Sequence, residues 1–295
     1  MAPYLLGPKL EDGGRLPGKV HGERFVLRPK RNAEGYEALV KQLGEAGLRE
    51  ASVYDGLVCP FDERGEDASG RLKLMRDYAE AYAVSRGWTP ELVNEYADES
   101  HRKAYEAQSK GYLADEIVSV GGASADELLS EERRKVMREW SGSVCSPYNC
   151  PGLADNGSAV VLAEAGEVER LGVEPLARLT GYARVECAPS EFVETPVRAV
   201  EELRGALAEA GLDADWPIME MNESFGMQLP LYDERWPGVA LNVHGGAVAY
   251  GHPLGSAGVR VLVTLLYAMK RYGHKRGVTA VCFGGGGACA VSVER

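Results

Sequence analysis

Residues 242–260 read NVHGGAVAYGHPLGSAGVR, and residues 278–290 read VTAVCFGGGGACA. Side-chain packing alone does not account for two glycine pairs, a Gly-His-Pro corner and a thiol before four glycines. Glycine lets the backbone adopt positive φ, or approach a ligand closely, at little steric cost, so both runs indicate constrained loops. We therefore expect each loop to present one chemically useful side chain, His252 from the first and Cys282 from the second.

The local setting of these two side chains favours acid-base chemistry. His252 stands just before a predicted helix at residues 255–272, and helix N-termini favour negative charge. The apolar residues of that helix recur at helical spacing: Val259, Leu262, Val263, Leu266 and Met269. Cys282 ends a predicted strand at residues 278–282, and the following glycines can turn backbone N–H groups into a site. A thiol whose pKa is lowered by nearby imidazole and amide dipoles suits proton transfer at an acyl group.

Three motifs together resemble the C-terminal part of a thiolase. Residues 242–260 match the family's Asn-x-x-Gly-Gly-Ala…Gly-His-Pro-x-Gly-x-x-Gly-x-Arg pattern. MEMNESFGMQ at residues 219–228 matches its Asn-Glu-Ala-Phe segment, and CFGGGGACA is similar to its Cys-x-Gly-Gly-Gly loop. Alone, a Gly-His-Pro corner is usually a turn, a buried cysteine an apolar filler and Asn222 a helix cap. Their joint occurrence in the family's order, with Asn222, His252 and Cys282 thirty residues apart in turn, is specific.

The resemblance implies an α/β chain with the thiolase fold. It implies a complete C-terminal half-domain with a mixed sheet and flanking helices, a loop domain, and only the end of the N-terminal half-domain. We expect the loop-domain-like region at residues 1–120, the N-terminal remnant at 121–174 and the C-terminal half-domain at 175–295.

The patterns also predict individual elements. Helices are expected at residues 32–47, 72–86, 90–110 and 195–210, and after a capping box at 124–127. The resemblance implies strands at residues 159–163, 176–187 and 218–221. Thr89 and Thr195 are expected to cap the helices at 90–110 and 195–210, each with a proline at the first helical position.

The resemblance also implies roles for four residues. His252 would activate a nucleophilic cysteine and help bind the thioester oxyanion, and Asn222 would hold the water that completes that oxyanion hole. Cys282 would move the proton at the α-carbon of a second acyl-CoA, and the N–H of Gly284 would contribute to a second oxyanion hole. The reaction would be Claisen condensation of acyl-CoA units or the thiolysis of 3-ketoacyl-CoA, with CoA thioesters as substrates and no cofactor or metal.

The source of the nucleophile is a separate question. The resemblance begins at Ala2, partway into the family's pattern, and the family's nucleophilic cysteine lies before that point. The remaining cysteines lack the strand-to-helix setting that aims and activates a thiolate: Cys59, Cys145, Cys150, Cys187 and Cys289. We therefore expect a separate N-terminal thiolase chain, or a rearranged homo-oligomer, to supply the nucleophile and the strands beside residues 159–163.

Two other hypotheses remain open. The chain could be a non-catalytic thiolase-like protein that binds acyl-CoA or a partner, which is favoured by Glu194 because its carboxylate falls near the expected CoA path. It could instead be a truncated fragment, which would fold poorly. Retention of Asn222, His252 and Cys282 leads us to favour an acyltransferase subunit.

Composition excludes several other classes of protein. The 295-residue chain carries a net charge of −11, and its acidic residues are dispersed, which argues against a nucleic-acid-binding surface. We expect no signal segment and no membrane span, because no apolar run approaches the required length. Its six cysteines form no Cys-x-x-Cys pair, so we expect reduced thiols, no metal and a cytoplasmic location.

Overall fold

The computed structural model describes residues 75–120, 124–126, 129 and 143–295. Within this part of the chain, Arg76–Arg295 form one compact unit. The helix predicted at residues 32–47, and most of the one expected after residues 124–127, lie outside the described residues. The division of the chain at residues 120 and 174 stays a prediction.

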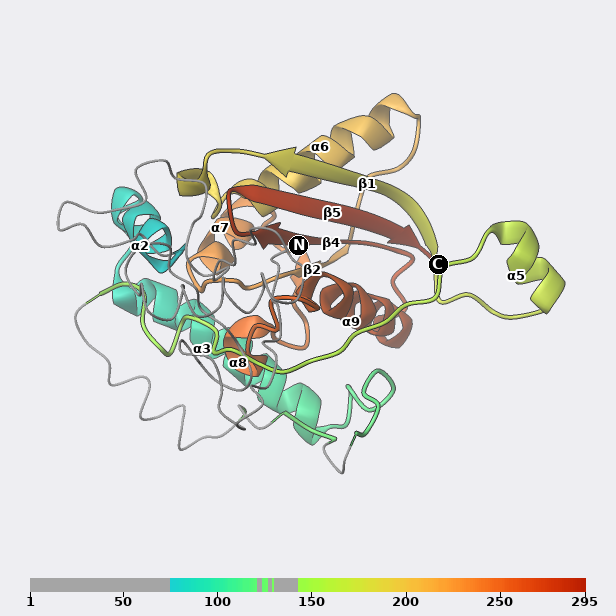
Figure 1. Ribbon diagram of the computed structural model, residues 1–295, viewed down its shortest axis with the longest axis horizontal. Helices are drawn as coiled ribbons and strands as arrows, with labels where there is room; N and C mark the ends of the chain where they lie inside the picture. Colours follow the sequence, from blue (N-terminus) through green and yellow to red (C-terminus); the bar gives the residue numbers. More distant parts are fainter. Residues whose placement is uncertain (1–74, 121–123, 127–128, 130–142) are drawn as a thin grey trace, which may run out of the picture. The chain divides into compact units, whose positions relative to one another are not determined.

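A mixed sheet of five strands forms the centre of this unit (Figure 1). The strands follow one another across the sheet as β1 (Arg178–Glu186), β5 (Gly287–Glu294), β4 (Arg276–Phe283), β2 (Ile218–Met221) and β3 (Ala240–Leu241). β5 is antiparallel to both β1 and β4, whereas β2 is parallel to both β4 and β3. The predicted mixed sheet is confirmed, as are the predicted strands at residues 176–187 and 218–221, within two residues at their ends.

Two long helices cover opposite faces of the sheet. α6 (Thr195–Glu209) packs closely on β1, where a Cβ atom built on Gly181 would lie 2.9 Å from Leu203 Cδ1. α9 (Ala257–Tyr272) packs closely on β4, where a Cβ atom built on Gly277 would lie 2.9 Å from Leu265 Cδ1. Glycine at both positions therefore lets a helix approach the sheet.

The strand register assigns each side chain to one of these faces. Gly181 pairs with Ser292 of β5, and Ser292 pairs in turn with Val278 of β4, which follows Gly277 directly. Because side chains alternate along a strand, Val278 and Cys282 point toward α6, while Gly277 and Val281 point toward α9. The core on the α9 side consists of aliphatic and methionine side chains: Ile218, Leu265, Leu266, Ala268, Met269 and Val293.

Helices from the first half of the described chain pack beside this sheet domain. α2 (Met75–Ser85) is followed by α3 (Pro90–Ser109), whose predicted cap is confirmed because Thr89 Oγ1 accepts a hydrogen bond of 3.3 Å from Leu92 N. The buried face of α3 is made of small residues and one valine: Val93, Ala97, Ser100, Ala104 and Ala107. These short side chains let α3 approach α7 (Gln228–Arg235) and α8 (Ala247–Tyr250).

The strand predicted at residues 159–163 is absent, so this prediction is wrong. The segment runs without regular structure, with Val161 97 % and Leu162 69 % exposed. β-propensity produces a strand only where a neighbour satisfies its N–H and C=O groups, and no described strand pairs with this segment. A short helix that the sequence analysis did not predict, α5 (Ala165–Leu171), follows it and ends at Gly172 with φ +62°.

Two helix details also differ from the sequence-based expectation. The N-cap of α6 is Glu194, not Thr195, whose hydroxyl instead donates a hydrogen bond of 2.7 Å to the carbonyl of Phe192. The buried face of α9 is rotated relative to the predicted stripe, because packing on the sheet selects between two apolar stripes. It consists of Ala257, Val261, Thr264, Leu265, Leu266, Ala268 and Met269.

Candidate active site

Asn222 and Cys282 lie at the same edge of the sheet because the parallel strands β2 and β4 both end there. Met221, the last residue of β2, pairs with Ala280 of β4. The next residue continues this ladder, since Asn222 N donates a hydrogen bond of 2.9 Å to Ala280 O. Cys282 lies two residues farther along β4. The carboxyl ends of neighbouring parallel strands commonly gather functional side chains in this way.

The segment after β2 supplies two side chains that contact the Cys282 thiol. The thiol donates to Ser224 Oγ across 3.1 Å, and Gln228 Nε2 donates to the sulfur at 3.6 Å. Asn222 Nδ2 donates to the same Ser224 Oγ at 2.7 Å, so one hydroxyl connects the amide to the thiol. All four side chains are buried. Sequence reasoning selected Asn222 here and missed Ser224, although serine in place of the alanine of Asn-Glu-Ala-Phe was a visible signal.

Burial controls the protonation of this thiol. Desolvation raises the pKa of Cys282, and the hydrogen bonds from Ser224 and Gln228 oppose this effect less strongly. The sequence-based expectation of a lowered pKa is therefore wrong for the described structure. Cys282 is a protonated thiol at neutral pH, with two hydrogen-bonding groups beside it that can stabilise a thiolate.

His252 lies in a corner between α8 and α9 and is held by its backbone. Its N–H donates a hydrogen bond of 2.7 Å to Gly152 O, and it forms an isolated parallel bridge with Leu153. Gly251, immediately before it, has φ +91°, which explains the glycine at that position. No hydrogen bond among the described residues joins the imidazole to Asn222 or Cys282.

The imidazole of His252 is neutral at physiological pH. Burial, and then the charge of Arg260, lower its pKa to about 4. Nδ1 is buried without a hydrogen-bond partner among the described residues. A neutral ring with a free nitrogen can accept a proton, which is the property a general base requires.

A buried polar cluster that sequence reasoning missed lies around Arg260. The Arg260 guanidinium acts electrostatically on His252, Glu116 and Glu220, although two of its nitrogens have no hydrogen-bond partner in the described part of the chain. Burial raises the pKa of Glu116 to about 7 and raises that of Glu220 well above its ordinary value. The charge of Arg260 therefore acts both on the imidazole and on two carboxyl groups whose pKa burial raises.

The glycines after Cys282 form a tight hairpin. Gly284 is exposed in the turn at residues 284–286 that joins β4 to β5. A Cβ atom on Gly286, where φ is +94°, would lie 2.3 Å from Cys187 O. A Cβ atom on Gly287 would overlap the Phe283 ring at 1.9 Å. Packing thus accounts for Gly286 and Gly287, while the role expected for the Gly284 N–H stays a prediction.

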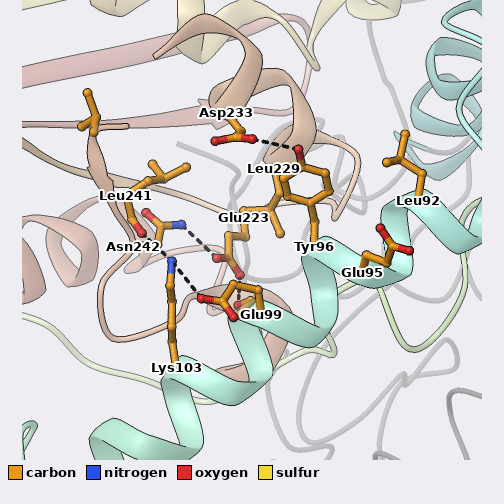
Figure 2. A pocket seen from close by; sticks show the side chains of 12 residues that line it. Leu92, Glu95, Tyr96, Glu99, Lys103, Glu223, Leu229, Asp233, Leu241 and Asn242 are labelled. Atoms are coloured by element: carbon orange, nitrogen blue, oxygen red, sulfur yellow. Dashed lines mark hydrogen bonds and ion pairs between the residues drawn. The ribbon is translucent and has the colours of Figure 1, made fainter. Parts of the chain in front are cut away.

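A pocket lies beside the segment after β2 and is separate from the thiol. It has a volume of about 430 Å³ between α3, α7 and the end of β3, and Glu223 and Asn242 form part of its lining (Figure 2). Asn242 Nδ2 donates to Glu223 Oε1 at 2.9 Å and to Met221 O. These two lining side chains therefore hold the segment after β2 in place. Neither Cys282 nor His252 contributes to the pocket.

The carboxylate of Glu194, expected near the CoA path, is already engaged. It accepts hydrogen bonds of 2.9 Å from the Tyr82 hydroxyl and from Arg198. Its charge is therefore compensated within the chain and does not stand free to repel a phosphate. Among the described residues no cluster of three His, Cys, Asp or Glu side chains could hold a metal ion. In this same part of the chain, no helix combines the length and apolar character needed to cross a bilayer.

Comparison with known proteins gives a consistent result. Residues 173–295 match the family model described as "Thiolase, C-terminal domain". The chain is 36 % identical over 283 residues to a probable acetyl-CoA acetyltransferase of Dictyostelium discoideum, covering 88 % of this chain and 62 % of that relative. It is 34 % identical to an acetyl-CoA acetyltransferase of Chromobacterium violaceum, covering 86 % and 66 % of the two chains. The chain thus spans a little under two thirds of the length of these relatives.

Solved structures are similar in fold as well as in sequence. A thiolase from Ascaris suum in complex with coenzyme A is 28 % identical with a TM-score of 0.66, over 83 % of this chain and 65 % of that one. The acetyl-CoA acetyltransferase of Bacillus anthracis is 26 % identical with a TM-score of 0.69, over 84 % and 65 %. The α/β fold class expected from the sequence is confirmed by these neighbours and by the mixed sheet.

Proposed function

We propose that this chain, which belongs to the thiolase family and carries the family's C-terminal domain, transfers acyl groups between thioesters of coenzyme A. The reaction would be Claisen condensation of two acyl-CoA molecules or the thiolysis of a 3-ketoacyl-CoA. The observation that carries the proposal is the position of the Cys282 thiol. It is buried at the edge where β2 and β4 end, within hydrogen-bonding distance of Ser224 and Gln228.

The protonation states of the two titratable site residues are compatible with this chemistry. In thiolysis, the protonated thiol of Cys282 would donate a proton to the α-carbon of the departing acyl-CoA, and the resulting thiolate would be supported by Ser224 and Gln228. In condensation, the same sulfur would take that proton as a thiolate. Neutral His252 would accept the proton of a nucleophilic cysteine at the start of the acyl transfer.

The oxyanion-binding roles are proposed for one side-chain oxygen and one backbone N–H group. Asn222 Oδ1 is buried without a partner among the described residues, so it could hold the water expected to complete the first oxyanion hole. Gly284, exposed in the β4–β5 turn, would offer its N–H to the second hole. A CoA thioester would be the substrate, and the proposed steps need no cofactor or metal.

We further propose that the nucleophilic cysteine comes from a separate N-terminal thiolase chain. None of the other described thiols, at Cys145, Cys150, Cys187 and Cys289, contacts Cys282, Asn222 or His252 through a hydrogen bond. The exposed apolar segment at residues 159–163 offers a surface on which partner strands could add. Self-association into a homo-oligomer is the alternative way to cover it. The five described cysteines are all free thiols, which supports a reducing compartment such as the cytoplasm.

The test is acetoacetyl-CoA thiolysis by the purified chain, alone and mixed with an N-terminal thiolase chain that carries the nucleophile. We expect activity in the mixture that is lost with Cys282→Ala. The matched control is Cys289→Ala, because Cys289 lies in β5 on the opposite face of the sheet and outside the site. Binding of acyl-CoA by the folded chain without turnover in any mixture would contradict catalysis and favour a non-catalytic thiolase-like protein.

A further inference from the structure

Ser224 connects two of the candidate site residues, Asn222 and Cys282. Its Oγ atom accepts a hydrogen bond of 2.7 Å from Asn222 Nδ2 and one of 3.1 Å from the thiol of Cys282. The side chain is only 6 % exposed, so bulk water does not replace these contacts readily. A residue selected only to fill space would need no hydroxyl here, since the family's Asn-Glu-Ala-Phe segment has alanine at this place.

A hydroxyl suits both protonation states of a neighbouring thiol. It has one O–H donor and two acceptor lone pairs. Asn222 Nδ2 can only donate, so it occupies one lone pair and leaves the donor and the other lone pair for Cys282. The protonated thiol donates to that free lone pair, and when the proton leaves, the hydroxyl rotates and donates its O–H to the thiolate. Gln228 Nε2 donates to the sulfur at 3.6 Å, but it cannot accept the proton of the thiol, so unlike Ser224 it cannot exchange its role when the thiol ionises.

We propose that Ser224 is a positioning residue that stabilises the thiolate of Cys282 and fixes it relative to Asn222. Through this one hydroxyl, the Cys282 thiol and the Asn222 amide keep a constant separation. The thiol would move the substrate proton, and the amide would hold the oxyanion water. The role in turnover rests on the proposed acyl transfer, but the effect on the thiol does not.

The surroundings of Cys282 make this effect measurable. The phenol of Tyr232 in α7 interacts electrostatically with the thiol of Cys282. Burial raises the pKa of Tyr232 well above its ordinary value, so the phenol stays neutral while the thiol titrates. Against the larger effect of burial, the hydrogen bonds with Ser224 and Gln228, and then a backbone hydrogen bond at Cys282, lower the pKa of the thiol.

The test follows the thiol directly by NMR titration of the full chain with 13Cβ-labelled cysteine, with the Cys282 signal assigned through Cys282→Ser. A hydrogen bond to a charged group is worth enough to move a pKa by about one to two units. We expect Ser224→Ala to raise the titration midpoint of Cys282 by that amount, while Ser224→Thr, which keeps the hydroxyl, stays close to wild type. The Cys289 signal serves as the internal reference.

An unchanged midpoint in Ser224→Ala, or an equal shift in Ser224→Thr, would overturn the proposal. Where the mixture with an N-terminal chain is active, Ser224→Ala should also lower kcat at unchanged KM and move the pH profile with the thiol. If no mixture is active but the midpoint still shifts, the proposed enzymatic function fails while the role of Ser224 in holding the thiolate stands.

Discussion

The hydroxyl of Ser100 in α3 donates a hydrogen bond of 2.7 Å to the buried Oε2 atom of Glu223, which follows Asn222 directly. The same carboxylate accepts a hydrogen bond of 3.0 Å from Val248 N. It also accepts one of 2.9 Å from Asn242 Nδ2 (Figure 2). Ser100, Val248 and Asn242 all donate hydrogen bonds to this side chain, so position 223 requires a group that can accept three hydrogen bonds. Glu223 therefore fastens the segment carrying Asn222 and Ser224 to α3 and to the loop that leads to His252.

We predict that Glu223→Gln lowers the free energy of unfolding by about 2–3 kcal/mol, because its amide nitrogen would face one of three donors and leave it unsatisfied. Urea unfolding followed by circular dichroism measures the change. The control is Glu95→Gln, the same chemical change at an exposed site on α3, where we expect less than about 0.5 kcal/mol. Equal effects at the two positions would contradict the role assigned to Glu223.

The close approach of α3 to the glycine pair gives a second prediction. Gly245 has φ +76°, and a Cβ atom there would lie 2.5 Å from Ser100 O and 2.7 Å from Ala104. Backbone atoms cannot yield as a side chain can, so Gly245→Ala should destabilise the fold by about 3 kcal/mol or more. Thermal unfolding of the variant measures the loss.

The matched control for that change is Gly205→Ala in α6. Gly205 is exposed, and a Cβ atom there would meet nothing within 4 Å. Replacing glycine by alanine inside a helix should stabilise the chain by roughly 0.5–1 kcal/mol. If both variants changed stability by the same amount, the tight contact at Gly245 would not be the cause.

Sequence reasoning correctly located helices and strands that are specified by short stretches of sequence. Thr89 followed by Pro90 marks the start of α3, and residues Ile218–Met221 form β2 at the position that the resemblance implied. The resemblance implied catalytic roles for both Asn222 and Cys282, and the parallel pairing of β2 with β4 brings both residues to the same edge of the sheet. These features depend on capping, propensity and strand order.

The features that sequence reasoning missed depend on the environment of each residue. Val160 and Val161 have strand propensity, but no described neighbour pairs with them, so no strand forms. The thiol pKa of Cys282 was expected to fall, but burial, which a sequence does not display, raises it. The same holds for Arg260, because nothing in the sequence indicates that its charge acts on Glu116, 144 positions away along the chain.

Glu116 predicts how stability depends on pH. Burial raises its pKa from 4.5 to about 7, so the folded chain keeps the proton to higher pH than the unfolded chain. Its contribution to stability is then complete below about pH 4.5 and is lost as the pH rises toward 7. Glu116→Gln keeps an acceptor for the Thr264 hydroxyl and removes this titration. Between pH 4 and 8 it should gain stability relative to wild type, by at most about 3 kcal/mol.

The measurement is urea unfolding of Glu116→Gln and wild type at a series of pH values. The control is Asp115→Asn, the same kind of chemical change at the exposed neighbouring position, which leaves the Glu116 carboxyl in place. A Glu116→Gln difference that is constant from pH 4 to 8 would contradict the burial of the carboxyl group. Comparing variants is necessary because His252 has the opposite dependence in wild type.

The final prediction concerns His252 and Arg260. Burial first, and then the charge of Arg260, lower the pKa of His252 from 6.5 to about 4, so the stability linked to the neutral ring is lost as the pH falls from 6.5 toward 4. Arg260→Gln removes the second cause and leaves the first. We expect the titration midpoint of His252 to rise above 4 but to stay below 6.5.

NMR titration of the chain with 13C-labelled histidine measures this midpoint, with the His252 signal identified among the five histidines through His252→Gln. The control is Arg276→Gln, an arginine of β4 paired with Asp213, which should leave the midpoint in place. A midpoint that reaches the ordinary value in Arg260→Gln would mean that charge, not burial, keeps the ring neutral. A midpoint that does not move would contradict the effect assigned to the Arg260 charge. In either case the base strength available to a nucleophilic cysteine is read from the same titration, since it is set by the pKa of this imidazole.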